Sequence, residues 1–500
     1  MTAAARRWQV AAATLFALFG VVLVRTAWLS DDAYITLRTV DNFVNGYGLR
    51  WNVVERVQTY THPLWMFLLA VPYAVTREPF FTMVLPQMAI ALVTVWMLAF
   101  RIAADRLTAC LALLLLVFSK AFVEYSTSGL ENPLTHVLLV LFLVAFWRDR
   151  RDQRVLWVLA SLLMLTRLDA GLLVLPMLTV AWRDAPRGTR LRDAAIGLSP
   201  LVAWEVFSIV YYGFPFPNTA YAKLQTGVAA SDLMRQGLLY FADGVRRDPV
   251  TLGASAVIAA AALRRDPRGA WPIVAGMALY YGYIVRIGGD FMMGRFLSAP
   301  YVCAVALFAH RPWSAWPRAL AAAAIAIATL GTFATTRPPI TSGSETFVLS
   351  GTEGMGLSGI ADERAFYYRY TGLLRWTREV PLPHNEEEVR GRDTRVRGAR
   401  VVEQASIGLF GYFAGPEIHV VDPFGIGDPL LARRPARPGW RIGHFQRDIP
   451  QRYVESIERG ENLIYDSTIA AQYERIRTVT QGPLWSRRRW RAIRQLNLGW

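Results

Sequence analysis

Apolar residues are distributed unevenly along this chain, and their distribution limits the fold more than any other feature of the sequence. Between Trp8 and Ala334 they fall in blocks of about 12 to 22 residues, close to the roughly 20 that a membrane-spanning helix needs. The stretch from Thr335 to Trp500 has instead the mixed composition of a soluble domain. We therefore expect a polytopic α-helical membrane domain over residues 1–334, with about eleven transmembrane helices, and a C-terminal extracytoplasmic α/β domain over residues 335–500.

The first apolar block ends directly on two adjacent carboxylates, Asp31 and Asp32. The block begins near Trp8 and is longer than the apolar core of a signal peptide, so we expect a retained span. Charges at such a depth are costly and usually functional. The pair could act as a general base, bind a divalent cation, or simply cap the next helix. The loop 30–62, rich in aromatic and hydrogen-bonding side chains, is the expected catalytic outer loop.

The charge pattern predicts which turns face outward. Arginine-rich loops separate many of the apolar blocks and should face the cytoplasm. The parity of the spans requires one short block, Pro63 to Val75, to be re-entrant or interfacial. The less basic turns then face outward with Asp31 and Asp32. Their candidate substrate-binding residues are His62, Glu131, Arg167, Asp169, Asn218, Lys223, Asp290 and Arg295.

These candidate residues have complementary chemistry. The cations His62, Arg167, Lys223 and Arg295 suit a phosphate group, while the carboxylates can accept hydrogen bonds from sugar hydroxyls or orient the cations. For each of them a structural ion pair is an equal alternative. The carboxylate pair could bind a divalent cation, but the residues define no metal site, and no other cofactor is expected.

The C-terminal region has the pattern of a small α/β domain. It begins with a glycine- and serine-rich linker, Thr341 to Gly359. Strands are expected at Val401 to Ile407 and at Ile418 to Val421. Helices are expected at Ile449 to Arg459 and at Thr468 to Ile476.

Several function classes are not expected from this sequence. The net charge of +16 fits arginine-rich loops and lipid headgroups better than nucleic acid. The two cysteines lie in apolar blocks and fit neither a disulfide framework nor a metal site. Walker-type, His-Glu-x-x-His, Cys-x-x-Cys and Gly-x-Ser-x-Gly motifs are absent, which argues against an ATP-driven pump, a zinc protease or a serine hydrolase.

Several stretches of the chain together match the pattern of a known family. They are 31–38, 45–52, 55–65, 128–134, 166–169, 211–213, 217–223, 288–296, 407–412, 421–422 and 427–429. Together they resemble the GT-C glycosyltransferases that use polyprenyl-phosphate sugars, and most of all the terminal β-(1→2) arabinofuranosyltransferase family. The family commonly has Pro-Asp after the residue matching Arg167, where this chain has Leu168-Asp169.

The resemblance implies an inverting transfer of a sugar, best matched by arabinofuranose, from a decaprenyl- or polyprenyl-phosphate donor. The acceptor would be a cell-envelope glycan or lipoglycan at the outer face of the plasma membrane. In this interpretation Asp31 is the base, and Asp32 orients the acceptor or a divalent cation. His62, Lys223 and Arg295 would hold the donor phosphate. Alternatives are a GT-C enzyme with another sugar, a lipid-linked-sugar flippase or secondary transporter, or a glycan-binding protein.

Overall fold

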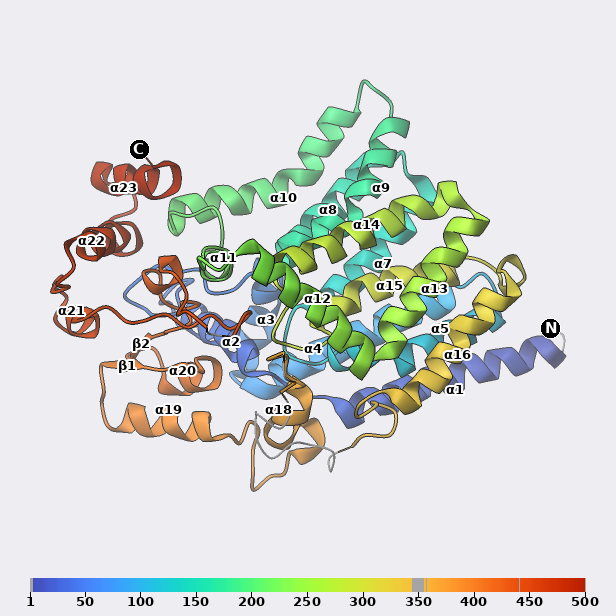
Figure 1. The fold of residues 1–500 in the computed structure, drawn as a ribbon, viewed down its shortest axis with the longest axis horizontal. Coiled ribbons are helices and arrows are strands. Elements are labelled where there is room, and N and C mark those ends of the chain that lie inside the picture. Colours follow the sequence, from blue (N-terminus) through green and yellow to red (C-terminus); the bar gives the residue numbers. More distant parts are fainter. Residues whose placement is uncertain (1–2, 344–354, 357, 440, 500) are drawn as a thin grey trace. The chain divides into compact units, whose positions relative to one another are not determined.

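The computed structural model describes residues 3–343, 355–356, 358–439 and 441–499, and these are mostly α-helical (Figure 1). Most of the linker predicted at Thr341 to Gly359 lies outside the described residues. The chain divides into two compact units, each built from three separate segments. Unit 1 comprises Met1–Ser30, Met83–Pro200 and Ala230–Leu382, and unit 2 comprises Asp31–Thr82, Leu201–Ala229 and Pro383–Trp500.

Unit 1 is a bundle of helices. Its core helix is α15 (Ser298–Ala309), in which every residue is buried. Helix α1 packs on α5, α7 on α8, α9 on α14, and α13 on α16 (Figure 1). The bounds of its other helices are α1 (Ala3–Thr26), α5 (Arg106–Phe118), α6 (Lys120–Glu124), α7 (Asn132–Asp149), α8 (Gln153–Thr166), α9 (Gly171–Asp184), α12 (Ala230–Arg247), α13 (Pro249–Arg265), α14 (Pro267–Ile287), α16 (Arg318–Ala334) and α18 (Glu363–Thr371).

Aspartates begin several of these helices. The side chains of Asp105, Asp152, Asp248 and Asp266 each accept a hydrogen bond from the backbone N–H three residues further on. Such caps satisfy N–H groups that a helix leaves unpaired at its start.

A glycine permits the close contact between α14 and α9. A Cβ added at Gly276 of α14 would lie 2.0 Å from the carbonyl oxygen of Leu173 in α9.

Three helical segments of the described chain are long and apolar enough to cross a membrane by length and composition: Arg7–Thr26, Pro79–Ile102 and Arg190–Tyr211. The second contains α4 (Pro79–Met97), and the third coincides with α10 (Arg190–Tyr211). Other apolar helices are shorter, among them α3 (Pro63–Thr76), at the block expected to be re-entrant. The chain is thus a helical membrane protein, and the total of about eleven spans stays a prediction.

Unit 2 combines helices with a small parallel sheet. Strand β1 (Val401–Glu403) pairs with β2 (His419–Val421), with Val402 opposite Val420, and α20 (Gly408–Ala414) connects them. The two strands and the two helices predicted in the C-terminal region are therefore present. The remaining helices of this unit, besides α3, are α2 (Asp31–Val44), α11 (Asn218–Leu224), α19 (Glu386–Val396), α21 (Tyr453–Arg459), α22 (Ser467–Gln481) and α23 (Arg487–Leu498).

A buried arginine lies at the centre of unit 2. The Arg38 guanidinium of α2 is 2% exposed and donates hydrogen bonds to the carbonyl oxygens of Trp51 (3.0 Å), Gly411 (2.9 Å) and Ile418 (2.7 Å). It also stacks on the Trp51 ring, 4.3 Å from the ring centroid. Residues 31–82 and 383–500 therefore share one core. The division predicted at residue 334 separates a membrane domain from an extracytoplasmic domain. The two compact units do not test where a segment lies relative to the membrane, so this division stays a prediction.

Four charged side chains form a buried network in unit 1. The Nζ of Lys120 lies 2.5 Å from an oxygen of Glu124 and 3.2 Å from one of Asp362, and the Nε of Arg364 lies 2.7 Å from Glu124. None of these side chains is more than 3% exposed. Two buried cations thus face two buried carboxylates, and the network ties α6 to the start of α18. Arg337, with its side chain 28% exposed, lies 3.6 Å from Asp362 as a further cation.

Removing one charge from this network should be strongly destabilising, because a buried ion then loses its partner. We expect Glu124→Gln to lower the stability of the protein by about 3–5 kcal/mol, seen as a fall of the thermal midpoint in detergent. The control is Arg150→Gln, in an exposed pair with Asp184 whose side chains are 53% and 35% exposed; it should cost less than about 1 kcal/mol. Equal midpoints for the two variants would contradict this account.

Candidate functional site

The structure divides the candidate residues predicted from the sequence into two groups, one in each compact unit. Unit 1 holds the charged group from the turns around α7, α8 and α15, and unit 2 holds the acidic pair with the residues around it. Each group is described by itself. The unit 1 group is Glu131, Arg167, Asp169, Asp290 and Arg295, and the unit 2 group is Asp31, Asp32, His62, Asn218 and Lys223.

In unit 1, Glu131 joins two arginines. It precedes α7 and is fully buried. Its Oε1 lies 2.8 Å from Nη1 of Arg167 and 3.2 Å from Nη2 of Arg295. Arg167 follows α8 where the chain turns into a 3₁₀ helix, and Arg295 begins another 3₁₀ turn. Breaks between helices therefore bring these side chains together.

Two further carboxylates complete the unit 1 group. Arg167 forms a two-pronged ion pair with Asp169, with Nε to Oδ1 at 3.0 Å and Nη2 to Oδ2 at 2.6 Å. Arg295 lies 3.5 Å from Asp290. The group thus has one carboxylate more than it has guanidinium groups. Such a balance does not favour a phosphate, and it suits hydrogen bonding to neutral sugar hydroxyls better. The sequence analysis gave structural ion pairs as the alternative to phosphate binding. Arg167 and Arg295 form such ion pairs.

In unit 2, Asp31 caps a helix far along the chain. Its Oδ1 accepts a hydrogen bond from the N–H of Leu409 (2.8 Å) and its Oδ2 from that of Gly408 (3.0 Å). A Cβ at Gly408 would lie 1.8 Å from the Asp31 carbonyl oxygen, so this approach requires glycine. Burial raises the pKa of Asp31 to about 7, the Leu409 N–H lowers it, and the charge of Asp32 raises it. The cap is on α20 and not on the next helix along the chain, which was the alternative given for the acidic pair.

Asp32 lies on α2, and His62, which precedes α3, contacts the same helix through Thr36. Asp32 is half-buried, and Thr36, four residues further on, shares its helix face. The hydroxyl of Thr36 hydrogen-bonds to Nε2 of His62 at 2.8 Å. His62 is 6% exposed and directly precedes α3. The carboxylate and the imidazole thus belong to neighbouring positions of the same unit.

Asn218 holds a loop of the C-terminal region. Its amide nitrogen donates to the carbonyl oxygens of Gly425 (2.8 Å), Ile426 (3.1 Å) and Asp428 (3.1 Å), and its Oδ1 accepts from Nη1 of Arg433 (3.0 Å). Lys223 lies in the last turn of α11 and is half-buried. Asn218 therefore positions the neighbouring Arg433, which the sequence analysis did not single out.

The sequence analysis also missed three buried carboxyl groups of unit 2. Burial raises the pKa of Glu55 to about 8, of Asp428 to about 7 and of Asp422 to about 6. Asp422 and Asp428 accept hydrogen bonds from backbone N–H groups of their own loop, and Asp428 also accepts one from Tyr453 Oη at 2.8 Å. The sequence signal for Asp422 and Asp428 was the Asp-Pro-Phe-Gly-Ile-Gly-Asp-Pro loop after the second predicted strand, and Glu55 begins the matching stretch 55–65.

No group of three or more His, Cys, Asp or Glu side chains that could hold a metal ion is found among the residues that the structure describes. The donor set around Asp31 fits a metal poorly, because both of its oxygens accept backbone hydrogen bonds. We therefore derive no step that passes through a divalent cation.

The buried carboxyl groups make the stability of the protein depend on pH. At neutral pH the folded state keeps most of the proton on Glu55 and about half of one on each of Asp31 and Asp428, whereas the unfolded chain has released all three. Stability should therefore decrease as the pH rises from roughly 6.5 to 8. Burial lowers the pKa of His419 to about 3, so this histidine acts mainly below that window.

We expect the thermal midpoint of the purified protein to fall between pH 6.5 and 8, by up to about 1 kcal/mol of stability per pH unit for each such carboxyl. Glu55→Gln should flatten this dependence, since its amide does not titrate. The control Glu458→Gln, on an exposed side chain, should keep the wild-type slope. A midpoint that rises over this range would contradict the assignment.

Comparison with known proteins places these observations in a family context. No protein-family model and no solved structure matches the chain. A terminal β-(1→2)-arabinofuranosyltransferase of Mycobacterium tuberculosis is 26% identical over 540 residues, which cover 87% of this chain and 83% of that protein. One of Corynebacterium glutamicum is 28% identical over 340 residues, covering 55% of this chain and 46% of that protein. The resemblance predicted from the sequence, and with it the prediction of a transferase enzyme, is confirmed.

Proposed function

We propose that this protein transfers arabinofuranose from a polyprenyl-phosphate donor to a hydroxyl of a cell-envelope glycan at the outer face of the membrane. The observation that carries the proposal is the similarity to two arabinofuranosyltransferases, one of them matched over most of its length. The apolar helices support a lipid-linked donor, since they give a prenyl chain a place to lie. The C-terminal region would then face the outside, where the glycan is.

The reaction needs a base at the acceptor hydroxyl. The hydroxyl oxygen forms a bond to the anomeric carbon, the bond from that carbon to the phosphate oxygen breaks, and the hydroxyl proton passes to the base. The sequence alone assigned the base to Asp31. The hydrogen bonds of Asp31 to Gly408 and Leu409 favour a positioning role for it, because both of its oxygens are already engaged. We therefore assign the base to Asp32, half-buried on the face of α2 that also carries Thr36.

His62 is the residue of the group best placed to assist Asp32. It is held by Thr36, one helical turn from Asp32. Its imidazole can orient the acceptor or donate a hydrogen bond to the leaving phosphate.

Transfer is tested with the purified full chain in detergent, a short-chain polyprenyl-phosphate arabinofuranose and an arabinan oligosaccharide. Mass spectrometry should detect an acceptor that is one pentose heavier. A flippase or transporter makes no such product, because detergent has no two sides to connect. The anomeric configuration of the product, read by NMR, tests the predicted inversion: inversion fits one displacement with one base, and retention would contradict it.

We expect Asp32→Asn to lower kcat by about 10²–10⁴-fold, the usual contribution of a general base, with an unchanged thermal midpoint. Asp31→Asn should mainly lower the midpoint, because an amide cannot accept both backbone hydrogen bonds at the start of α20. Asp41→Asn, on the same helix, is the matched control and should leave kcat within a few-fold of wild type. Loss of turnover in Asp31→Asn with full stability would return the base to Asp31.

A further inference from the structure

The last helix of unit 2, α23, has a buried apolar side and an exposed basic side. Its sequence, Arg-Arg-Arg-Trp-Arg-Ala-Ile-Arg-Gln-Leu-Asn-Leu, contains five arginines and no acidic residue. Its buried residues are Arg489, Ala492 and Ile493, which lie three or four positions apart and so share one face. The opposite face carries the exposed side chains of Arg487, Arg491, Arg494 and Leu498. We call this second surface the arginine face.

Carboxylates neutralise little of the charge around this helix. Arg488 pairs with Glu474 of α22 at 3.1 Å, and the two side chains are 74% and 36% exposed. Arg487 and Arg491 form no ion pair within the part of the chain that the structure describes. The arginine face therefore presents a positive charge to whatever lies outside the protein.

An exposed tryptophan lies next to α23. Trp485, in the turn before the helix, is 75% exposed, and its ring stacks on that of Trp490 with the centroids 6.4 Å apart. Tryptophan is enriched where a membrane meets water, because its ring is apolar and its N–H is polar. Arginines beside an exposed tryptophan are typical of a helix on a membrane surface. A solvated helix can have the same composition, so the position of α23 decides between the two.

The buried side of α23 is bonded to the end of a membrane-length helix. Arg489 is fully buried, and it donates from Nη1 to the carbonyl oxygen of Val210 (2.8 Å) and from Nη2 to that of Tyr211 (3.0 Å). These are the last two residues of α10, which is long and apolar enough to cross a membrane. Asn497, near the other end of α23, donates to the carbonyl oxygen of Gly213 (2.9 Å). Two points along α23 thus fix it where α10 ends (Figure 1).

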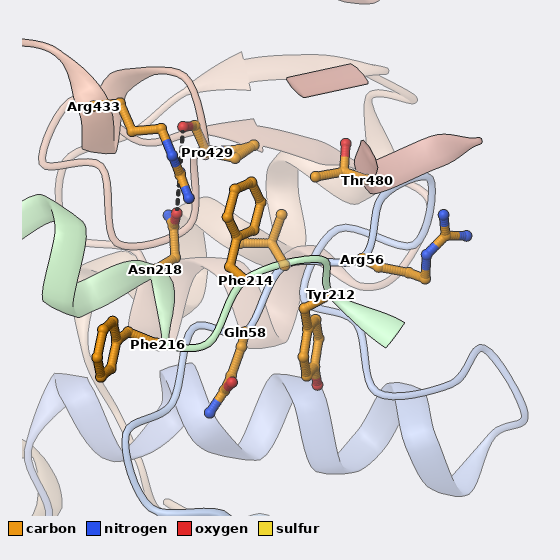
Figure 2. A pocket seen from close by; sticks show the side chains of 10 residues that line it. Arg56, Gln58, Tyr212, Phe214, Phe216, Asn218, Pro429, Arg433 and Thr480 are labelled. Atoms are coloured by element: carbon orange, nitrogen blue, oxygen red, sulfur yellow. Dashed lines mark hydrogen bonds between the residues drawn. The ribbon is translucent and has the colours of Figure 1, made fainter. Parts of the chain in front are cut away.

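A second buried arginine strengthens this junction. Arg56, from the loop after α2, donates to the carbonyl oxygens of Tyr211 (3.1 Å) and Val479 (3.2 Å). Arg489 also donates to that of Val479, at 2.8 Å. Figure 2 shows Arg56 and Tyr212, the residue that directly follows α10, beside the same small hollow of unit 2. Two guanidinium groups therefore hold α22, α23 and the end of α10 together.

Position and composition together point to what the arginine face contacts. A helix fixed to the end of a membrane span lies at the level of the lipid headgroups. We propose that α23 lies on the membrane surface at which α10 ends, where its arginine face binds anionic lipid headgroups and Trp485 enters the interface. The apolar side of α23 packs in a core cluster with Phe214 and Val479, so the contact is made by the arginine face. This inference depends on α10 as a span and not on the sugar that is transferred.

The contact is measured on the full chain in phosphatidylcholine nanodiscs, with a fluorophore on Gln495→Cys. Gln495 is exposed and lies one helical turn after Arg491, and the two native cysteines are buried. A minor fraction of spin-labelled phosphatidylglycerol or, separately, spin-labelled phosphatidylcholine serves as quencher. We expect phosphatidylglycerol to quench at least about 5-fold more strongly at low ionic strength, since each arginine near an anionic surface contributes about that factor. High salt should reduce the difference.

Two double variants test the role of the charges. Arg487→Gln/Arg491→Gln removes two exposed charges without touching the buried side of α23, and it should make quenching by the two lipids nearly equal. The matched control, Arg395→Gln/Arg397→Gln, removes two exposed charges elsewhere in unit 2 and should keep the preference for phosphatidylglycerol. Equal preference in the two double variants overturns the proposal.

Other outcomes identify a different partner for the arginine face. A label that neither lipid quenches shows that α23 does not lie on the membrane, and it overturns the proposal. The same holds if both lipids quench equally in the protein with unchanged arginines. Quenching by phosphatidylglycerol that an added arabinan oligosaccharide abolishes would assign the arginine face to the glycan acceptor instead of the lipid.

Discussion

Unit 2 depends on the hydrogen bonding of one buried cation, the Arg38 guanidinium. A buried guanidinium without partners would be very costly, so the backbone carbonyls that surround it are fixed in place. Those carbonyls belong to Trp51, Gly411 and Ile418. The helix that carries the acidic pair, the loop after it and the strand-helix-strand segment of the C-terminal region are thereby joined. The loop 30–62 is held by protein structure rather than by its position beside a membrane span.

The two units balance buried charge in different ways. Unit 1 pairs cations with carboxylates, in the Lys120 network and around Glu131. Unit 2 satisfies Arg38 and Arg56 with backbone carbonyls, and Asp31 with backbone N–H groups. Ion pairs leave little charge over for a ligand, whereas backbone partners leave the net charge of a side chain in place.

Local patterns in the sequence predicted local structure. The strands at β1 and β2, the helices α21 and α22 and the apolar helices are set by the spacing of apolar residues, which the sequence displays directly. Partnerships over long distances were not predictable. Glu124 meets Arg364 across 240 residues, and the partners of Asp31 are backbone groups with no side-chain signature. Arg433 lay outside every recognised stretch, and its aromatic neighbours and its hydrogen bond to Asn218 are visible only in the structure.

The cap that Asp31 places on α20 has a consequence for biosynthesis. The carboxylate and its partner Gly408 are 377 residues apart in the chain. At about 5 to 20 residues per second, the ribosome needs roughly 20 to 75 s to make the intervening chain. During that interval Asp31 has been made but the backbone N–H groups of Gly408 and Leu409 have not. A nascent chain that stalls before residue 408 therefore cannot assemble the proposed site, so sugar transfer would begin only after nearly the whole polypeptide has been made.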